Sequence, residues 1–242
     1  MRGSRHWRGA NETRRTTGRI YMRISGFSFA RNAQKLYYPV AESVRSILPI
    51  CDEFHIAIGK GDKEDRTREV VAGIGDPKIN IIDTVWEDRE RLRGNIHGKQ
   101  TNIALKQCTG DWCFYVQGDE VVHERDLPVV REACERYLHD YEVEGLLFRY
   151  RHFWGDFEHY HINHAWYPRE IRVIRNGVGI ESWESAQSFR RGGRKIRVVE
   201  IDAEIFHYGW VRPPKLMKAK QLEFSTTHSG RRKAEERFGE QT

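Results

Sequence analysis

The sequence has no long hydrophobic run and few sulfur-containing residues. No apolar segment approaches the roughly 20 residues needed to cross a bilayer, and the first segment lacks the apolar h-region of a secretory signal. None of the four cysteines stands at CxxC spacing, and they are Cys51, Cys108, Cys113 and Cys134. We therefore expect a cytoplasmic protein with free thiols.

Excess charge is also missing from most of the chain, although the net charge is +6. Residues 1–21 hold six of the 41 basic side chains and one of the 35 acidic ones, which leaves 35 and 34 for the rest. This segment is poor in apolar residues, so it is predicted to be disordered. It reads as a nucleic-acid or membrane-surface arm, an added leader, or translation from a start upstream of Met22. The last two are favoured because a core-forming pattern begins at Met22.

The composition fits a globular domain. The chain has 242 residues, 38% of them hydrophobic and 31% charged, and this length can bury a sizeable core. We expect one domain over residues 22–217. A charged helix or tail follows over residues 218–242, and its end, KAEERFGEQT, has no obvious closure, as in a chain that continues further.

Strand-like and helix-like segments alternate through the first half. Such alternation predicts right-handed crossovers and a parallel sheet. Asp126 is expected to cap a helix that has Pro128 in its first turn. Strands are expected at residues 22–30, 54–59, 79–83 and 113–116, and helices at 37–49, 67–72, 96–108 and from Asp126 onward.

The second half has a different texture. Its strand-like runs carry bulky aromatic residues, and Gly192-Gly193 is typical of a hairpin turn. The runs are LLFRYRHFW, EIRVIR, KIRVV and AEIFHYGW. The predicted fold class is therefore α/β, with a Rossmann-like nucleotide-binding half followed by a mixed β-rich half.

The stretch CFYVQGDEVVHE, residues 113–124, is the centre of the functional prediction. An unbroken apolar strand stops at Gln117, and Asp119 and Glu120 follow. In open α/β sheets ligands bind outside the carboxyl ends of the strands. Two carboxylates there can hold Mg²⁺ or Mn²⁺ and, through it, a phosphate. The alternative is a polar strand exit without a ligand.

Several motifs together resemble the family-2 glycosyltransferases with the GT-A fold. They are FSFARN, GKGDKEDRT, GNIHGKQTNIAL and YVQGDEVV, in this order. The similarity is greatest to a bacterial subgroup with an AQ-x-F-R segment and HYGWVRPP, here AQSFR (186–190) and HYGWVRPP (207–214). The resemblance covers about residues 22–217, and the combination is more specific than any single motif.

The resemblance implies a nucleotide-sugar site. Asp62 and Asp65 would meet the base and ribose of the donor, because a carboxylate accepts from both a ribose hydroxyl and a base N–H. The alternative for these two acids is a solvated turn that caps a helix. The other residues that the resemblance places at the donor are Phe29, Arg31, Asn32, Lys99, Gln100, Asn102, Gln117 and Gly118.

The family's metal motif is usually Asp-x-Asp, and Gln117 departs from its first position. Asp119 matches the second Asp, with Glu120 beside it. His207 is expected to complete the coordination of Mg²⁺ or Mn²⁺ through a neutral imidazole. The alternative is a packed, hydrogen-bonded histidine.

The resemblance also implies a general base from the second half. ESWESAQSF offers Glu181 and Glu184, while Ser185 stands where an acid is expected. Glu184 is one residue away, which a loop tolerates and a strand does not. If no base is present, the chain is a weak or inactive transferase.

A histidine-rich run, RHFWGDFEHYHINH (151–164), suggests a second metal site. His159 and His161 would share a strand face, joined by His164 or Glu158. The spacing fits no zinc signature, so a surface that faces the acceptor is preferred. Four aromatic residues are candidates for stacking on sugars, with a core or interface role as the alternative. They are Trp154, Tyr160, Trp166 and Tyr167.

These expectations combine into a glycosyltransferase that moves a sugar from a nucleotide-diphosphate donor to an acceptor hydroxyl, with inversion and metal assistance. The acceptor is a glycan, a lipid-linked sugar or a small molecule, and peripheral membrane contact is left open. One rival is a nucleotidyltransferase acting on a sugar phosphate, although FSFARNAQK lacks the glycines expected there. The other is a nucleic-acid-binding module that uses the arginine tail.

Overall fold

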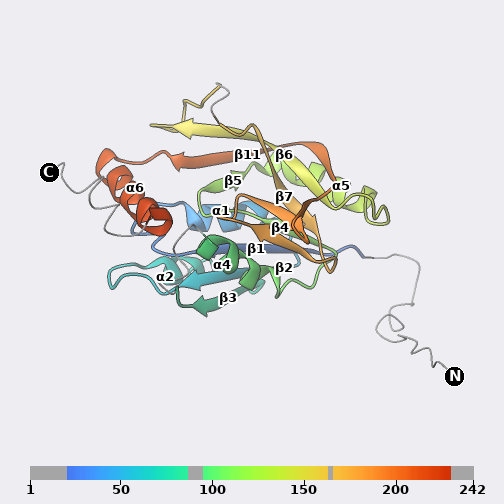
Figure 1. The fold of residues 1–242 in the computed structure, drawn as a ribbon, viewed down its shortest axis with the longest axis horizontal. Helices are drawn as coiled ribbons and strands as arrows, with labels where there is room; N and C mark the ends of the chain where they lie inside the picture. Colours follow the sequence, from blue (N-terminus) through green and yellow to red (C-terminus); the bar gives the residue numbers. More distant parts are fainter. Residues whose placement is uncertain (1–20, 87–94, 163–165, 230–242) are drawn as a thin grey trace.

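The structure is a computed structural model that describes residues 21–86, 95–162 and 166–229. The arginine tail therefore lies outside the described residues, except for Tyr21. The main feature of the fold is an eight-stranded sheet with the order β3-β2-β1-β4-β7-β6-β11-β5 (Figure 1). A second, three-stranded sheet has the order β10-β9-β8 and is not hydrogen-bonded to the large one.

The first half forms the parallel part of the large sheet. β1 pairs in parallel with β2 and β4, and β2 pairs in parallel with β3, so all four carboxyl ends lie at one edge. The elements are β1 (Ile24–Ala30), α1 (Val40–Ile47), β2 (Glu53–Gly59), α2 (Thr67–Ala72), β3 (Ile79–Thr84), α4 (Asn95–Leu105) and β4 (Trp112–Tyr115), with a 3₁₀ turn at Leu48–Ile50.

The second half forms the mixed part. β7 is antiparallel to β4 and β6, β11 is parallel to β6, and β5 is antiparallel to β11. The elements are β5 (Glu120–Val122), α5 (Leu127–Arg136), β6 (Gly145–Trp154), β7 (Arg169–Arg175), β8 (Ile180–Trp183), β9 (Ser188–Arg191), β10 (Arg194–Lys195), β11 (Val198–Trp210) and α6 (Pro214–Ser229), with a 3₁₀ turn at Glu124–Asp126. The predicted α/β class and its mixed second half are confirmed.

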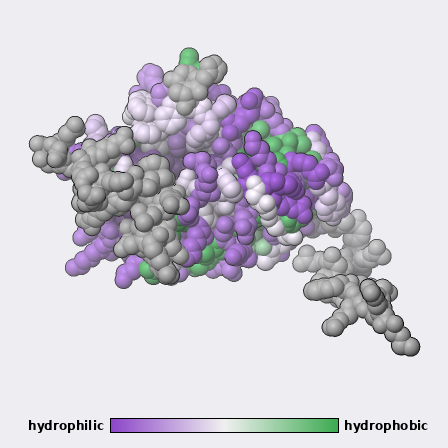
Figure 2. Space-filling view, viewed as in Figure 1, coloured by the Kyte–Doolittle hydropathy of each residue, from purple (hydrophilic) through white to green (hydrophobic). Residues whose placement is uncertain are grey.

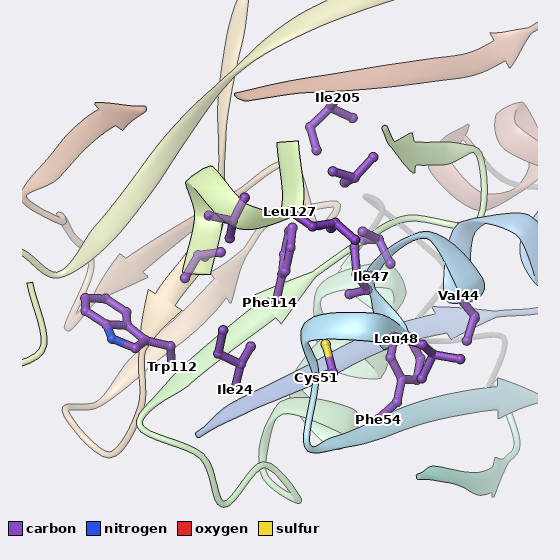
Figure 3. Close-up of a cluster of buried hydrophobic side chains, with 14 of the residues drawn as sticks. Ile24, Val44, Ile47, Leu48, Cys51, Phe54, Trp112, Phe114, Leu127 and Ile205 are labelled. Atoms are coloured by element: carbon purple, nitrogen blue, oxygen red, sulfur yellow. The ribbon is translucent and has the colours of Figure 1, made fainter. Parts of the chain in front are cut away.

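β4 is buried on both faces, as its unbroken apolar run predicts. Trp112 and Phe114 enter one hydrophobic cluster together with side chains of α1 and α5 (Figure 3). Cys113 and Tyr115 point the other way, into a second cluster that includes residues of α4, β8 and β9. The sheet is therefore packed between α1 and α5 on one face and α4 with the small sheet on the other.

The surface contrasts with this core. The view in Figure 2 shows a described surface that is mostly hydrophilic, with small separate apolar patches. All four cysteines are buried and free, in agreement with the predicted thiols. Within the described residues, no helix is both long enough and apolar enough to cross a membrane.

Two local predictions need correction. Asp126 stands at the start of α5, yet its side chain does not cap the helix and instead accepts from the Glu204 backbone N–H at 3.0 Å. The run KIRVV is not one strand, because it is divided between β10 and β11. Gly192 and Gly193 do form the predicted hairpin turn between β9 and β10, both with positive φ.

The predicted end of the domain at residue 217 falls inside α6. This helix begins at Pro214 and contacts the end of β11 through Lys220. The domain boundary itself stays a prediction. Residues 230–242 of the predicted tail lie outside the described residues.

Candidate functional site

Polar side chains gather at the edge where β1 and β2 end. Asn32 follows β1 in a left-handed conformation, φ 53°, which asparagine adopts more readily than most residues. Its side-chain oxygen accepts from the Asp62 backbone N–H at 2.8 Å. The buried Asn32 amide thus fixes the acidic loop after β2.

Asp62 is paired with two basic side chains. Its carboxylate is 2.6 Å from Lys35 Nζ and 3.7 Å from Arg31, and its side chain is 42% exposed. The hydrogen bond from Lys35 lowers the pKa of Asp62, with Arg31 contributing to the same direction. Asp62 is thus an ionised, partly solvated carboxylate beside the predicted donor residue Arg31.

Asp65 has more local contacts. It accepts from the hydroxyl of Thr67 at 2.8 Å, at the start of α2, and from the Lys35 backbone N–H at 3.3 Å. It also lines a cavity of about 430 Å³ at the carboxyl ends of β2 and β3. Its carboxylate also accepts from the Thr67 backbone N–H at 3.3 Å, so Asp65 contacts the first turn of α2, as in the alternative for this residue, and still lines a cavity.

Phe29 contributes to an aromatic group above this edge. Its ring stacks on His97 at 5.4 Å and lies 6.2 Å from Trp86, which in turn lies under the Arg31 guanidinium. Gly59 makes this close packing possible, since a Cβ there would lie 2.3 Å from Trp86 Nε1. The structure thus brings Phe29, Arg31, Asn32 and the Asp62 loop together.

The three predicted residues of α4 have different surroundings. Gln100 is buried and accepts from the Thr84 hydroxyl at 2.6 Å, which ties α4 to the end of β3. Asn102 accepts from the Ser182 backbone N–H at 2.8 Å, which ties α4 to β8. Asn102 and Lys99 line a second cavity, of about 400 Å³, and Glu184 lines it too. Their donor roles stay predictions.

Gln117 and Gly118 follow β4 directly. The side-chain amide of Gln117 donates to the Ala186 carbonyl at 2.9 Å, and the backbone carbonyl of Gln117 accepts from the Ser43 hydroxyl at 2.6 Å. A Cβ at Gly118 would only touch Val40 at 3.7 Å, so packing does not require glycine there. Gln117 therefore joins the end of β4 to the turn that contains Glu184.

Glu120 points into the interior and is 0% exposed. Arg172 donates to both of its carboxylate oxygens, at 2.8 and 2.7 Å, and Tyr150 donates its hydroxyl at 2.7 Å. The Gln117 backbone N–H donates a fourth hydrogen bond at 3.0 Å. Such a bidentate, fully hydrogen-bonded pair satisfies a buried charge. Coordination of a metal by Glu120 would require some of these bonds to break.

Asp119 lies beside Glu120 in sequence but has other partners. It is 6% exposed, and its carboxylate lies 3.3 Å from Lys220 Nζ and 3.5 Å from His207 Nε2. Burial alone would raise the pKa of Asp119, but the charge of Lys220 and the contact with His207 outweigh it and hold the pKa well below its usual range. Asp119 is therefore an ionised carboxylate in a nearly dry setting.

His207 belongs to a chain of polar contacts. His152 Nε2 lies 2.8 Å from the Tyr167 carbonyl, and the Nδ1 atoms of His152 and His207 are 2.9 Å apart. Burial lowers the pKa of His152 to about 4, so at neutral pH it donates to Tyr167 and accepts from His207. That leaves His207 Nε2 facing Asp119. The structure shows the packed, hydrogen-bonded alternative for His207 and places it at the predicted carboxylate.

Gly209 gives Asp119 and His207 their room. A Cβ at this position would lie 2.5 Å from His207 Nε2 and 3.0 Å from Asp119 Oδ2. Its carbonyl accepts a hydrogen bond from Lys220 Nζ at 2.6 Å. The backbone of the HYGW segment is thus part of the site.

Helix α6 connects the two ends of the site. Lys220 contacts Asp119 after β4, and Glu223, three residues later, lies 2.6 Å from Arg31 after β1. Arg212, just before the helix, donates to the Leu36 carbonyl at 2.7 Å and lies over the Tyr38 ring. The sequence predicts only a charged helix or tail over residues 218–242, and it does not indicate a role for Lys220.

The surroundings of Asp119 fit a divalent cation poorly. In the part of the chain that the structure describes, no three His, Cys, Asp or Glu side chains are grouped so as to hold a metal ion. Glu120 is occupied by Arg172, and the ammonium of Lys220 lies against Asp119. A ligand set needs free lone pairs, and here a protein cation already neutralises the carboxylate. The metal role of Asp119, Glu120 and His207 stays a prediction.

Glu181 and Glu184 are exposed residues at and after β8. Glu184 and Ala186 both have positive φ, 49° and 63°, so Ser185 lies at the centre of a tight turn. The Glu184 carbonyl packs against α4, where a Cβ at Gly98 would approach it to 2.5 Å. Glu184 does lie in a loop, which is the setting that its predicted role requires.

Glu170 is a further acid that the motifs did not indicate. It lies on β7, two residues before Arg172, where burial raises its pKa and a hydrogen bond with Ser188 opposes the rise. Burial raises the pKa of Tyr167, and the charges of Asp119 and Glu170 add to the rise. A half-buried carboxylate with a raised pKa is a typical setting for a general base. The missed signal was a lone acid at the start of an otherwise basic and apolar strand.

The histidine-rich run does not form the expected strand face. Residues 151–154 are the end of β6, and the rest of the described part is a loop joined to it by one bridge between Phe153 and Tyr160. His159 pairs with Asp156 at 2.9 Å, whereas His161 stacks on Trp166 at 5.2 Å. His164 lies outside the described residues. A histidine metal site is not observed among residues 151–162.

The aromatic residues of this region form a cluster near Lys220. Trp154 and Trp210 stack with centroids 4.9 Å apart, Trp166 meets both rings, and Lys220 lies 5.7 Å from the Trp210 centroid. Trp154, Tyr160 and Tyr167 are each more than 40% exposed. The cluster is thus part packed interior and part accessible surface, and a sugar-binding role stays a prediction.

These features describe an α/β protein with a charged site along the carboxyl edge of a largely parallel sheet. A family model described as "Glycosyl transferase family 2" matches residues 30–197. Because this match covers more than half of the chain, the protein belongs to glycosyl transferase family 2. The predicted GT-A type of fold is confirmed with it.

Solved structures show lower similarity. Staphylococcus aureus TarS 1–349 in complex with UDP is 17% identical with a TM-score of 0.47, and the match covers 85% of this chain and 65% of that one. Glucosyl-3-phosphoglycerate synthase from Mycobacterium tuberculosis in complex with Mn²⁺, UDP and phosphoglyceric acid is 14% identical with a TM-score of 0.36, covering 54% and 43%. The chain thus spans less than two thirds of either structure. No curated protein matches it.

Proposed function

We propose that the protein transfers a sugar from a nucleotide-diphosphate sugar to an acceptor hydroxyl. The observation that supports this most is the site along the carboxyl edge, where Asp62, Arg31 and Asp119 follow β2, β1 and β4 and α6 contacts two of them. Membership in glycosyl transferase family 2, matched over residues 30–197, supplies the reaction class.

The donor would lie along this edge with its nucleoside at the Asp62 loop and its diphosphate toward Asp119. Asp62 has two carboxylate oxygens in a partly solvated position, which suits ribose hydroxyls or a base N–H. Arg31, Lys35 and Lys220 are the basic groups that suit an anionic diphosphate. Positive charge is what a departing diphosphate requires.

The transfer would be a single displacement with inversion at the sugar carbon. A carboxylate removes the proton of the acceptor hydroxyl as that oxygen attacks, and the nucleoside diphosphate departs on the opposite side. Glu184, Glu181 and Glu170 are the candidates for this base. Glu184 has the loop setting, and Glu170 has a pKa that burial raises, which favours proton uptake.

The acceptor would approach from the side of the aromatic cluster. Rings of Trp154, Tyr160 and Tyr167 offer exposed faces on which sugars stack. An acceptor that carries a sugar, either a glycan or a lipid-linked sugar, therefore fits better than a small molecule without one. The predicted rivals, nucleotidyl transfer and nucleic-acid binding, are less favoured because the matched family consists of glycosyl transferases.

Donor binding can be tested by a thermal-shift panel. The probes are UDP, GDP, ADP, CDP and dTDP with their common sugar conjugates, each with EDTA and with Mn²⁺. At least one probe should raise the melting temperature of the wild-type protein and have a much smaller effect on Asp62→Asn and Asp119→Asn. If no probe shifts the wild-type protein under either condition, the proposed function is wrong.

The base can be identified by comparing Glu170→Gln, Glu181→Gln and Glu184→Gln. Turnover of the best donor, followed by release of its nucleoside diphosphate, should fall by about 10²-fold or more in one variant only. That variant should still bind the donor and should lose the acidic limb of the pH profile. Equal, small losses in all three would exclude these acids as the base.

A further inference from the structure

Asp119 already has a cation of the protein beside it, although its family position predicts a metal ligand. Lys220 Nζ is 3.3 Å from the Asp119 carboxylate, and its side chain is only 14% exposed. The same nitrogen donates to the Gly209 carbonyl at 2.6 Å. An ammonium has three N–H donors, and these two contacts account for two of them.

Burial lowers the pKa of Lys220, and the Asp119 carboxylate opposes that shift by favouring the charged ammonium. Lys220 Nζ lies 4.9 Å from the ring centroid of Tyr38 and 5.7 Å from that of Trp210. Aromatic faces attract a cation within about 6 Å. The Asp119 carboxylate supplies the countercharge. A neutral Lys220 amine would lose the charge attraction to the rings and to Asp119.

Helix α6 fixes Lys220 at a second point. Glu223 lies one turn along the helix and pairs with Arg31 at 2.6 Å. Arg31 also donates to the Lys60 carbonyl at 3.0 Å, so this second attachment belongs to the edge where β1 and β2 end. The helix is thereby held at both ends of the proposed donor site.

Glu120, a predicted metal ligand, and Gln117, at the first position of the family's metal motif, are engaged elsewhere. Arg172 and Tyr150 use the oxygens of Glu120, and Gln117 holds the Ala186 carbonyl. A divalent cation at Asp119 would have to displace the Lys220 ammonium and would find only His207 as a second side-chain ligand among the predicted residues. The site lacks the carboxylate pair and gains a lysine.

We infer that Lys220 is the resident cation of the donor site and neutralises the donor diphosphate in place of a divalent metal ion. The inference rests on the proposed function, since it concerns the same nucleotide-sugar site. The third N–H of Lys220 would donate to a diphosphate oxygen while Asp119 and Gly209 hold the ammonium. Sugar transfer then needs no added metal, and positive charge meets the leaving diphosphate from α6.

The first test uses only the wild-type protein. The nucleoside diphosphate with the largest thermal shift in the panel is titrated calorimetrically in EDTA and in Mn²⁺. The dissociation constants should agree within about threefold, because the charge is built into the chain. A dissociation constant at least tenfold lower in Mn²⁺ than in EDTA would overturn the inference while leaving the proposed function intact.

The second test compares Lys220→Ala, Lys220→Arg and Lys215→Ala. Lys215 is an exposed lysine of the same helix and serves as the matched control. Lys220→Ala should weaken binding by about tenfold or more, since a charge-assisted hydrogen bond is lost. Lys220→Arg should recover part of the loss, and Lys215→Ala should change nothing. Melting temperatures without ligand show whether each variant is folded.

Two results of the second test would count against Lys220. Equal effects of Lys220→Ala and Lys215→Ala would show that the charge of Lys220 does not reach the diphosphate. Tighter binding by Lys220→Ala would show that the lysine occludes the site. If Lys220→Ala does not fold, Lys220→Gln and the metal dependence of the wild-type protein decide the question. Absence of binding by the wild-type protein under all conditions would instead refute the proposed function.

Discussion

Asp119 and Glu120 are neighbours in sequence, yet their surroundings are opposite in kind. Glu120 receives all of its hydrogen bonds from within the sheet and the loop before it, from Arg172, Tyr150 and the Gln117 backbone. Asp119 receives its countercharge from α6, a helix that follows the last strand. The comparison teaches that adjacent acids in a motif can divide into one that is bonded within the sheet and one that pairs with a separate helix at the proposed donor site.

The largest effect is expected from Glu120→Gln. Removing one charge of the buried pair leaves Arg172 without its counterion, which should lower the free energy of unfolding by about 3–5 kcal/mol. Urea unfolding measures the change. Glu124→Gln is the control, since that side chain is 87% exposed and should change stability by less than about 0.5 kcal/mol. Near-equal stabilities of the two variants would show that Glu120 does not stabilise the fold.

Asp119→Asn should act mainly on the reaction. Loss of the carboxylate that positions Lys220 should reduce transfer by about 10²-fold, the size seen when one preorganised electrostatic group is removed. The measurement is the turnover number with the best donor, alongside the melting temperature. A variant that unfolds like Glu120→Gln but turns over normally would reverse the assignment of the two acids.

Glu53 is an intermediate case and predicts a pH dependence. Burial raises its pKa, but hydrogen bonds from Ser25 and from the backbone and hydroxyl of Thr109 outweigh that and hold the pKa at about 2. Because the folded pKa is lowered, the stabilisation is present above the unfolded pKa and is lost as pH falls through the folded one. Glu53→Gln should therefore cost about 1–2 kcal/mol at pH 7 and progressively less below pH 4.

The control for that pH effect is Asp202→Asn, which removes a strongly exposed carboxylate, 84% accessible. It should change the stability at pH 7 by less than about 1 kcal/mol. Urea midpoints at pH 7 and pH 3 decide the matter. A Glu53→Gln effect that is equal at both pH values would show that the carboxylate charge does not contribute.

The smallest effect is expected from Lys35→Ala. Its pair with Asp62 has a short distance of 2.6 Å, but both side chains are more than 40% exposed. Exposed pairs contribute about 0.2–1 kcal/mol, so stability should barely change. Donor binding should weaken only modestly. A loss of stability as large as that of Glu120→Gln would mean that the exposed Asp62 pair stabilises the fold as much as the buried Glu120 pair.

Much of the fold could be predicted from the sequence because its periodicity is strong. The α2 helix at residues 67–72 and the β2 strand follow from local patterns, and the four-residue apolar run after Trp112 marks a strand buried on both faces. The strand KIRVV was wrong in extent, because a β-propensity pattern does not show where the chain changes sheets.

The site could be predicted only in part. The position of Asp119 follows from the rule that ligands lie at carboxyl ends of parallel strands. The partners of Glu120 and Asp119 come from β7 and α6, 52 and 101 residues further along the chain. Lys220 has no local signal, since one lysine in a charged helix looks like any solvated lysine. Long-range pairing of charges has to be seen in three dimensions.

Gly209 sets a limit on how this chain can vary. A single methyl group there would meet both the imidazole of His207 and the carboxylate of Asp119, so one of them has to move. Moving the imidazole also separates it from His152, and moving the carboxylate separates it from Lys220. Because glycine has only a hydrogen atom in place of Cβ, Asp119 after β4, the His152–His207 pair and α6 can all pack at this position.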